Sequence, residues 1–252
     1  MSPAFKIEIP NLYDAKKILA IQPHYDDNDI PAGGTIAALA QAGIEIVYLT
    51  CSDDQMGVID EKWSFEEADA RLKKDQADAA QILGVKRHHW LGYPDAGEYN
   101  YFDLRRNIMR VMRMESPDYV ITVDPWLAYE AHNDHIITGK AAAEAAILCG
   151  LKRIKTDPDV DAAYEPHDIK AVAFYGTQYP NTCFDISGTI EKKLQAVRCY
   201  HAQFQEEELE TLAGYAEFKA SQCAEGQAFK YAEMWKVVTP RLLHGFTETW
   251  KF

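Results

Sequence analysis

The chain has 252 residues, and its 26 Lys and Arg against 39 Asp and Glu give a formal net charge of −13. Its length suits one α/β domain with insertions, and a composition of 47% hydrophobic and 26% charged residues is typical of a folded protein rather than a disordered one. The acidic excess disfavours nucleic acid and anionic membranes as partners, because both are bound through Lys and Arg.

The termini and the cysteines indicate a cellular compartment. Residues 1–10 contain no apolar stretch of signal-peptide length, and the chain has no run of about eighteen apolar residues that could span a bilayer. Its five cysteines are dispersed without a CxxC pair, which favours reduced thiols over a disulfide framework or a cysteine zinc site. We therefore expect a cytoplasmic protein.

Short apolar segments alternate with helical ones along most of the chain, which predicts a parallel sheet with helices on both faces. In chain order we first expect a strand over 17–22, a helix from Gly33-Gly34-Thr35 to Gly43, a strand over 44–50 and a helix that is capped by Ser64 and Glu67 and runs to about Gly84. The next expected elements are a strand over 88–93, a helix over 102–115, a strand over 119–123 and an Ala-rich helix over about 135–149. An excursion over 152–169, strands near 171–175 and 183–186, and two C-terminal helices complete the chain. The fold class is α/β, a Rossmann-like, mostly parallel sheet in a single domain over 1–252. Its core covers about 15–190, and helical additions cover about 188–252.

In such sheets the ligand site lies at the carboxyl ends of the strands. Three loops follow predicted strands and carry polar side chains: residues 23–29, 53–57 and 124–135. The chemistry of the chain is therefore expected in these loops.

Two of these loops combine histidines with acids. The first reads PHYDDND and places His24 before Asp26 and Asp27, and the second reads AHNDH and supplies His132 and His135. Each loop alone could be an ordinary Asp/Asn-rich turn. Together they offer imidazole nitrogens and carboxylate oxygens at one edge of the sheet, the ligand types of a zinc site.

At these residues the sequence resembles the zinc-dependent de-N-acetylases called LmbE-like or PIG-L-like. The resemblance rests on Pro23-His24-Tyr25-Asp26-Asp27, on Gly33-Gly34-Thr35, on Asp53–Gly57 and on His132-Asn133-Asp134-His135, and it covers most of the chain to about residue 150. The run from Asp124-Pro125-Trp126-Leu127 to Glu130-Ala131-His132 is most similar to diacetylchitobiose and N-acetylglucosamine deacetylases.

The resemblance implies a role for each matching residue. His24, Asp27 and His135 would be the ligands of Zn²⁺, and Asp26 would be the general base that takes a proton from the metal-bound water. His132 would stabilise the oxyanion, and Asp134 would orient a histidine as outer carboxylates do. The implied activity is a hydrolase that removes the N-acetyl group from a GlcNAc-containing mono- or disaccharide, a small-molecule amino-sugar substrate.

Three further positions are expected to bind substrate. Arg71 and Asp95 match family positions that contact the sugar, although Arg71 could be a solvated helical arginine and Asp95 a turn residue after Pro94. Some relatives carry an oxyanion-assisting tyrosine where this chain has Glu130, and the adjacent Tyr129 could take its place.

The sequence departs from the family at Tyr25, where a proline is usual, so φ is not fixed there and the rigidity of the loop is in question. The identity of the metal is also open, because a set of two histidines and one carboxylate also suits Fe²⁺ or another divalent metal. The substrate could be another N-acyl sugar conjugate, and the chain could form a homo-oligomer. A nucleotide- or sugar-binding α/β protein would use Gly33-Gly34-Thr35 for phosphate, but the acids before it oppose that.

Overall fold

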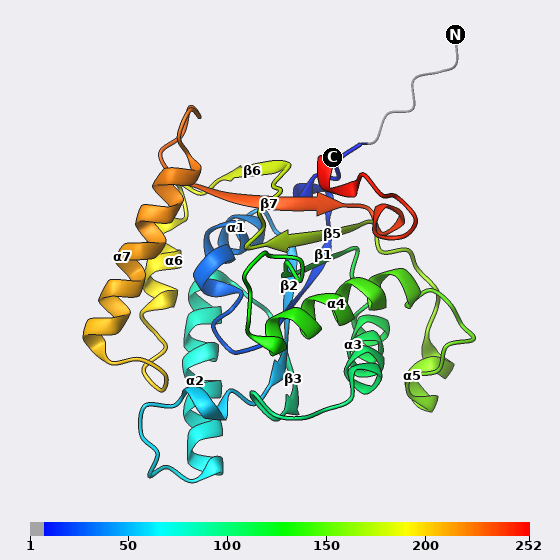
Figure 1. The fold of residues 1–252 in the computed structure, drawn as a ribbon, viewed down its shortest axis with the longest axis horizontal. Coiled ribbons are helices and arrows are strands. Elements are labelled where there is room, and N and C mark those ends of the chain that lie inside the picture. Colours follow the sequence, from blue (N-terminus) through cyan, green and yellow to red (C-terminus); the bar gives the residue numbers. More distant parts are fainter. Residues whose placement is uncertain (1–7) are drawn as a thin grey trace.

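The computed structural model describes residues 8–252 and contains a seven-stranded sheet with the order β3-β2-β1-β4-β5-β7-β6 (Figure 1). Its strands are β1 (Lys17–Gln22), β2 (Glu45–Ser52), β3 (Arg87–Tyr93), β4 (Tyr119–Val123), β5 (Ala171–Tyr175), β6 (Thr182–Asp185) and β7 (Ala232–Val238). The first five strands pair in parallel, and β7 pairs antiparallel to both β5 and β6. The predicted α/β class and single domain are confirmed.

Helices cover the sheet in two layers (Figure 1). They are α1 (Asp29–Gln41), α2 (Phe65–Leu83), α6 (Ile190–Val197) and α7 (Glu206–Cys223) in one layer, and α3 (Tyr101–Glu115), α4 (Asn133–Leu148) and the short α5 (Pro158–Ala163) in the other. Alternate residues of β1 serve the two layers: Ile18 and Ala20 pack in one hydrophobic cluster, and Leu19 and Ile21 pack in the other. Both faces of the strand are thus buried, which explains its continuous apolar sequence.

Most predicted elements are confirmed to within about two residues, including the capping box in which Ser64 and Glu67 satisfy each other's backbone amides. The start of α1 was predicted wrongly, because this helix begins at Asp29 and not at Gly33. Gly34 is required by packing inside the helix, since a Cβ there would lie 2.6 Å from Ile186 Cδ1. The glycines therefore mark a close approach and not a helix terminus.

The prediction that the chain ends in helices alone is also wrong, because β7 lies between β5 and β6. Two charged residues, Glu233 and Lys236, interrupt its apolar pattern, yet both are buried. Glu233 accepts hydrogen bonds from the backbone amides of Gly34 and Thr35 and forms a 2.6 Å ion pair with Lys193 of α6. Burial of a charged residue is possible when distant residues supply its hydrogen bonds and ion pairs. Such partners are not visible in the local sequence, so the local sequence did not indicate a buried strand here.

Within residues 8–252, no helix is long and apolar enough to cross a bilayer.

Candidate active site

The loops that follow β1 to β4 meet at the carboxyl ends of these strands, around an open cleft of about 340 Å³. The cleft is lined by His24, Asp26, Asp27, Asp54, Met56, Gly57, Asp95, Ala96, His132, His135 and Gln203. These residues come mainly from the loops after these four strands, and the parallel pairing of the strands places all four loops at the same edge of the sheet. The structure thus brings the predicted loops together at the edge of the sheet expected from the strand order.

The three predicted ligands, His24, Asp27 and His135, form one compact group. One carboxylate oxygen of Asp27 lies 3.0 Å from His24 Nδ1, and the other lies 3.3 Å from His135 Nε2. One ligand atom from each of the three side chains falls within 4.8 Å of the others, close enough to share an ion. On the far side of its ring, His135 Nδ1 lies 3.1 Å from Glu130 Oε2, a contact that fixes the ring orientation.

The charge around His24 favours a cation. Its Nε2 lies 3.2 Å from Asp95 and 3.6 Å from Asp134, in addition to the contact of its Nδ1 with Asp27. Burial alone would lower the pKa of His24, but hydrogen bonds to these three carboxylates outweigh it and raise the pKa above the ordinary value. Two imidazoles and a carboxylate in an excess of negative charge are a donor set that fits Zn²⁺ or a similar divalent metal.

Asp26 lies beside this group and faces the cleft. Burial, together with the neighbouring Asp27, raises the pKa of Asp26 to about 7. In Asp27, burial is outweighed by the hydrogen bond from His24 and by the charge of His135, so its pKa is lowered. The two adjacent carboxylates are therefore distinct, because Asp26 binds a proton more readily than Asp27 does.

The loop that carries these residues is held through the peptide at Tyr25. The Tyr25 carbonyl accepts hydrogen bonds from Gln22 Nε2 at 3.2 Å, from Gln76 Nε2 at 3.0 Å and from the Tyr200 hydroxyl at 3.0 Å. The Tyr25 amide, which a proline would lack, donates to Asp54 Oδ2 at 3.2 Å. Contacts from four parts of the chain thus fix the loop without the family proline.

The remaining predicted catalytic residues also lie in this region. His132 is the N-cap residue of α4; its ring stacks on that of His135 with centroids 5.0 Å apart and meets His24 edge-on at 4.7 Å. Asp134 is buried and accepts hydrogen bonds from the Ala96 amide at 2.9 Å and from the Tyr99 hydroxyl at 2.8 Å. Its carboxylate is thereby fixed facing His24.

The predicted substrate contacts are placed differently. Asp95 lines the cleft, where it also accepts the Met56 amide at 3.0 Å. Arg71 is exposed, and its guanidinium stacks 4.4 Å from the ring centroid of Trp63 outside the cleft lining. Tyr129 is also outside the lining, fully exposed at φ 69°. Substrate contact by these three residues stays a prediction.

Sequence reasoning assigned no role to Asp54 or Gln203, although both line the cleft. Asp54 is buried in the left-handed conformation after β2, within a loop in which the sequence predicts chemistry. Gln203 matches the last residue of the His-x-Ser-Gln pattern that often ends a helix in the family that the sequence resembles, whereas Tyr200 and Ala202 stand where that pattern has His and Ser. Position in that loop and agreement with that pattern were the signals that could have identified them.

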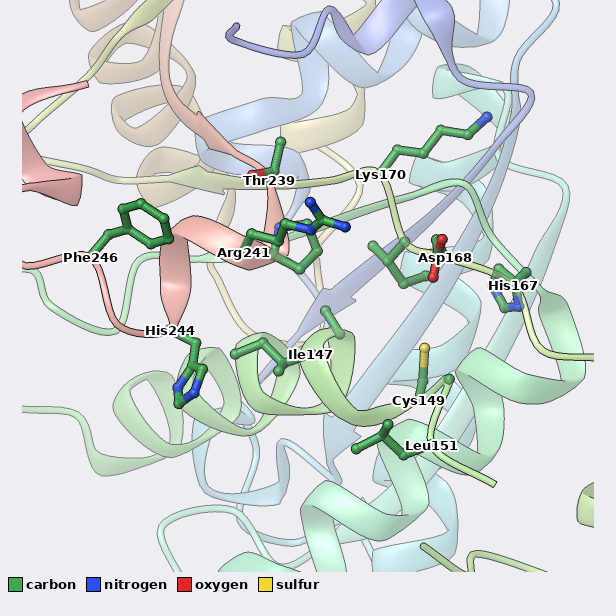
Figure 2. Close-up of a pocket in the computed structure, with 14 residues that line it drawn as sticks. Ile147, Cys149, Leu151, His167, Asp168, Lys170, Thr239, Arg241, His244 and Phe246 are labelled. Carbon is green, nitrogen blue, oxygen red and sulfur yellow. The ribbon is translucent and has the colours of Figure 1, made fainter. Parts of the chain in front are cut away.

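A separate cavity of about 770 Å³ lies at the opposite edge of the sheet, between the end of α4, the residues before β5 and the segment after β7 (Figure 2). The charged side chains in its lining include Asp168, Lys170 and Arg241. None of the predicted metal ligands or catalytic residues lines it. The chemistry-bearing residues therefore select the smaller cleft as the candidate active site.

Known proteins are similar to this chain in sequence and in fold. The model of the family described as "PIG-L: GlcNAc-PI de-N-acetylase" matches residues 19–146. The chain is 39% identical over 240 residues to the diacetylchitobiose deacetylase of Thermococcus kodakarensis, covering 95% of this chain and 89% of that protein. It is 28% identical to a probable N-acetyl-alpha-D-glucosaminyl L-malate deacetylase 2 of Bacillus anthracis, covering 75% and 82%. Among solved structures, the N,N'-diacetylchitobiose deacetylase of Pyrococcus horikoshii matches with a TM-score of 0.87 and 34% identity over 96% of this chain and 91% of that one.

Proposed function

This chain belongs to the PIG-L family of GlcNAc-PI de-N-acetylases, and on that premise we propose that it is a metal-dependent hydrolase that removes the N-acetyl group from a GlcNAc-containing mono- or disaccharide. The observation that carries the proposal is the grouping of His24, Asp27 and His135 beside the buried Asp26 in an open cleft. The names of the similar deacetylases support an N-acetylated amino sugar as the substrate.

In this proposal His24, Asp27 and His135 would hold the metal, and two imidazoles and one carboxylate favour Zn²⁺. A bound divalent cation supplies a Lewis acid that polarises the amide carbonyl and makes water more acidic. Glu130 orients the His135 ring through a contact with His135 Nδ1. The anchored Tyr25 peptide keeps His24 and Asp27 at their positions.

Asp26 takes the proton of the attacking water, a task that suits a carboxylate whose pKa is raised to about 7 by burial and by Asp27. His132, which lines the cleft, donates a hydrogen bond to the oxyanion that develops on the amide. The acetyl group leaves as acetate, and the amine accepts the proton that Asp26 received. Asp134 orients His24 from behind.

A second candidate is an amidase acting on another N-acyl sugar conjugate. The similarity to a probable N-acetyl-alpha-D-glucosaminyl L-malate deacetylase favours it, since the same cluster would serve a different sugar partner. A phosphate-binding role for Gly33-Gly34-Thr35 has no support, because these residues lie inside α1 and two of their amides bond Glu233. Cytoplasmic location and a homo-oligomeric state stay predictions.

The test is acetate release from N-acetylglucosamine and its β-1,4-linked dimer, with and without a chelator, together with elemental analysis of the purified protein. We expect chelation to abolish release and added Zn²⁺ or Fe²⁺ to restore it. His135→Ala should lose the metal, and the matched control His244→Ala, an exposed histidine of the opposite cavity, should keep it. Undiminished metal in His135→Ala would refute the ligand assignment. Failure of the native protein to release acetate from any N-acyl amino sugar would refute the activity.

A further inference from the structure

An aromatic pocket of about 230 Å³ lies between the loop after β4, strands β5 and β7 and the C-terminal segment. We use this name for the site lined by Trp126, Phe174, Tyr179, Trp250, Asp124 and Lys236, among other residues. It shares no lining residue with the metal cleft. Neither the metal chemistry nor the residues assigned above give it a role.

The rings of this pocket are arranged in two edge-to-face pairs. Trp126 meets Phe174 at a centroid distance of 5.6 Å, and Tyr179 meets Trp250 at 5.9 Å. Trp126 and Trp250 are each 55% exposed, and Tyr179 is 50% exposed. Rigid aromatic faces that stay open to solvent around a concave site are typical of surfaces that bind a flat, partly apolar ligand.

The lining of the pocket also contains two buried side chains of opposite charge. Asp124 and Lys236 are each 6% exposed. Asp124 Oδ1 accepts a hydrogen bond from the amide of Trp126 at 2.9 Å, which fixes the loop, and Lys236 Nζ donates one to a backbone oxygen of Phe252. Because both charged groups already have hydrogen-bond partners within the protein, the pocket suits a neutral ligand that offers hydroxyl groups. Pyranose rings combine such hydroxyls with apolar faces that stack on aromatic rings.

The loop after β4 joins this pocket to the metal cleft. Leu127 N bonds Asp124 O at 3.4 Å and Glu130 N bonds Leu127 O at 3.2 Å, so two successive turns link Asp124 to Glu130. Each turn brings its end Cα atoms to within about 7 Å, which limits the Asp124–Glu130 separation to about 14 Å. Glu130 in turn contacts the ligand histidine His135. The loop therefore keeps the cleft and the pocket within about the length of a short oligosaccharide.

We propose that the aromatic pocket is a second sugar-binding subsite, which holds a pyranose ring of the same neutral oligosaccharide whose N-acetyl group lies in the metal cleft. This inference rests on the proposed function, because it names where the rest of that substrate binds. The subsite makes the protein selective for oligosaccharides over the monosaccharide. It also disfavours substrates with a charged ring at this position.

The test compares kcat/KM for acetate release from N-acetylglucosamine with that from its β-1,4-linked dimer and trimer. Trp126→Ala and Trp250→Ala remove rings from two separate segments, and Phe218→Ala removes a ring of similar exposure (56%) from α7. We expect the ratio of oligosaccharide to monosaccharide kcat/KM to fall about tenfold in both tryptophan variants, as for the loss of one stacked ring, and to be unchanged in Phe218→Ala. An unchanged ratio in both tryptophan variants would overturn the proposal.

Two further measurements separate the subsite from competing explanations. Equilibrium dialysis against labelled trimer measures binding independently of hydrolysis, and it does not rely on the tryptophan rings that the variants remove. Binding by the native protein that is lost in Trp250→Ala, without any acetate release, would support the subsite and refute the proposed function. Sedimentation of each variant reports its oligomeric state. Dissociation of an oligomer in the tryptophan variants, with an unchanged substrate ratio, would show that a second copy of this chain covers the pocket, and the subsite would be rejected.

Discussion

Replacing Tyr200 by Phe removes one buried hydroxyl without leaving a cavity. It tests how the loop of residues 23–27, which carries His24, Asp26 and Asp27, is held in place. This hydroxyl lies 3.0 Å from the Tyr25 carbonyl and 2.5 Å from Asp29 Oδ2, and its single proton is shared between them. A hydrogen bond to a charged group contributes about 1.5–3 kcal/mol, so we expect Tyr200→Phe to lower the free energy of unfolding by about 2 kcal/mol. Burial raises the pKa of Asp29 to about 7, so the measurement belongs at a pH above that value, where the carboxylate is ionised.

The chain offers a matched control in Tyr48→Phe. The Tyr48 hydroxyl bonds the other oxygen of Asp29, also at 2.5 Å, and has no hydrogen bond to the Tyr25 carbonyl. Both variants should lose similar stability in urea unfolding of the metal-free protein. Tyr200→Phe alone should loosen the peptide between His24 and Asp26, and it should weaken Zn²⁺ binding about tenfold in competition with a chelating indicator. Equal weakening in both variants would show that Asp29, and not the Tyr25 carbonyl, holds the loop.

Two other predictions concern stability. A Cβ on Gly139 of α4 would lie 2.6 Å from the Val123 carbonyl oxygen, so Gly139→Ala should lower the free energy of unfolding by about 1–3 kcal/mol. Gly214 lies in open space on α7, so Gly214→Ala should raise the free energy of unfolding by up to about 1 kcal/mol. Two changes of the same sign in urea denaturation would contradict this prediction. Burial alone would raise the pKa of Glu115, but hydrogen bonds led by Arg87 lower it to about 2 from an ordinary 4.5. Ionised Glu115 therefore stabilises the fold above pH 4.5 and loses this effect as pH falls towards 2, by about 1 kcal/mol because Arg87 is half exposed. Glu115→Gln should flatten this part of the curve of unfolding free energy against pH, and a curve parallel to that of the native protein would refute the assignment.

The sequence was informative wherever the signal is local. Period and composition located β1 to β5 and the long helices, because a strand such as KILAIQ is buried on both faces and must be apolar throughout. The capping box at Ser64 could be identified for the same reason, since both partners lie within one turn. Local patterns failed to predict β7 and the start of α1. Glu233 of β7 accepts a hydrogen bond from Gly34 inside α1, a contact between residues far apart in the sequence.

For the site, residue types and their spacing already indicated which side chains could carry the chemistry. His24, Asp27 and His135 have the side chains that a metal needs, and the strand order placed their loops at one edge of the sheet. Spacing could not show that Gln76 and Tyr200, from distant segments, join the nearby Gln22 in holding the Tyr25 carbonyl. Nor could it show that Asp54 and Glu130 complete the surroundings of the cluster. These contacts join residues separated by up to 175 positions, so they depend on how the whole chain packs. Ligand chemistry belongs to individual side chains, whereas the geometry that makes them a site belongs to the packing of the whole sheet.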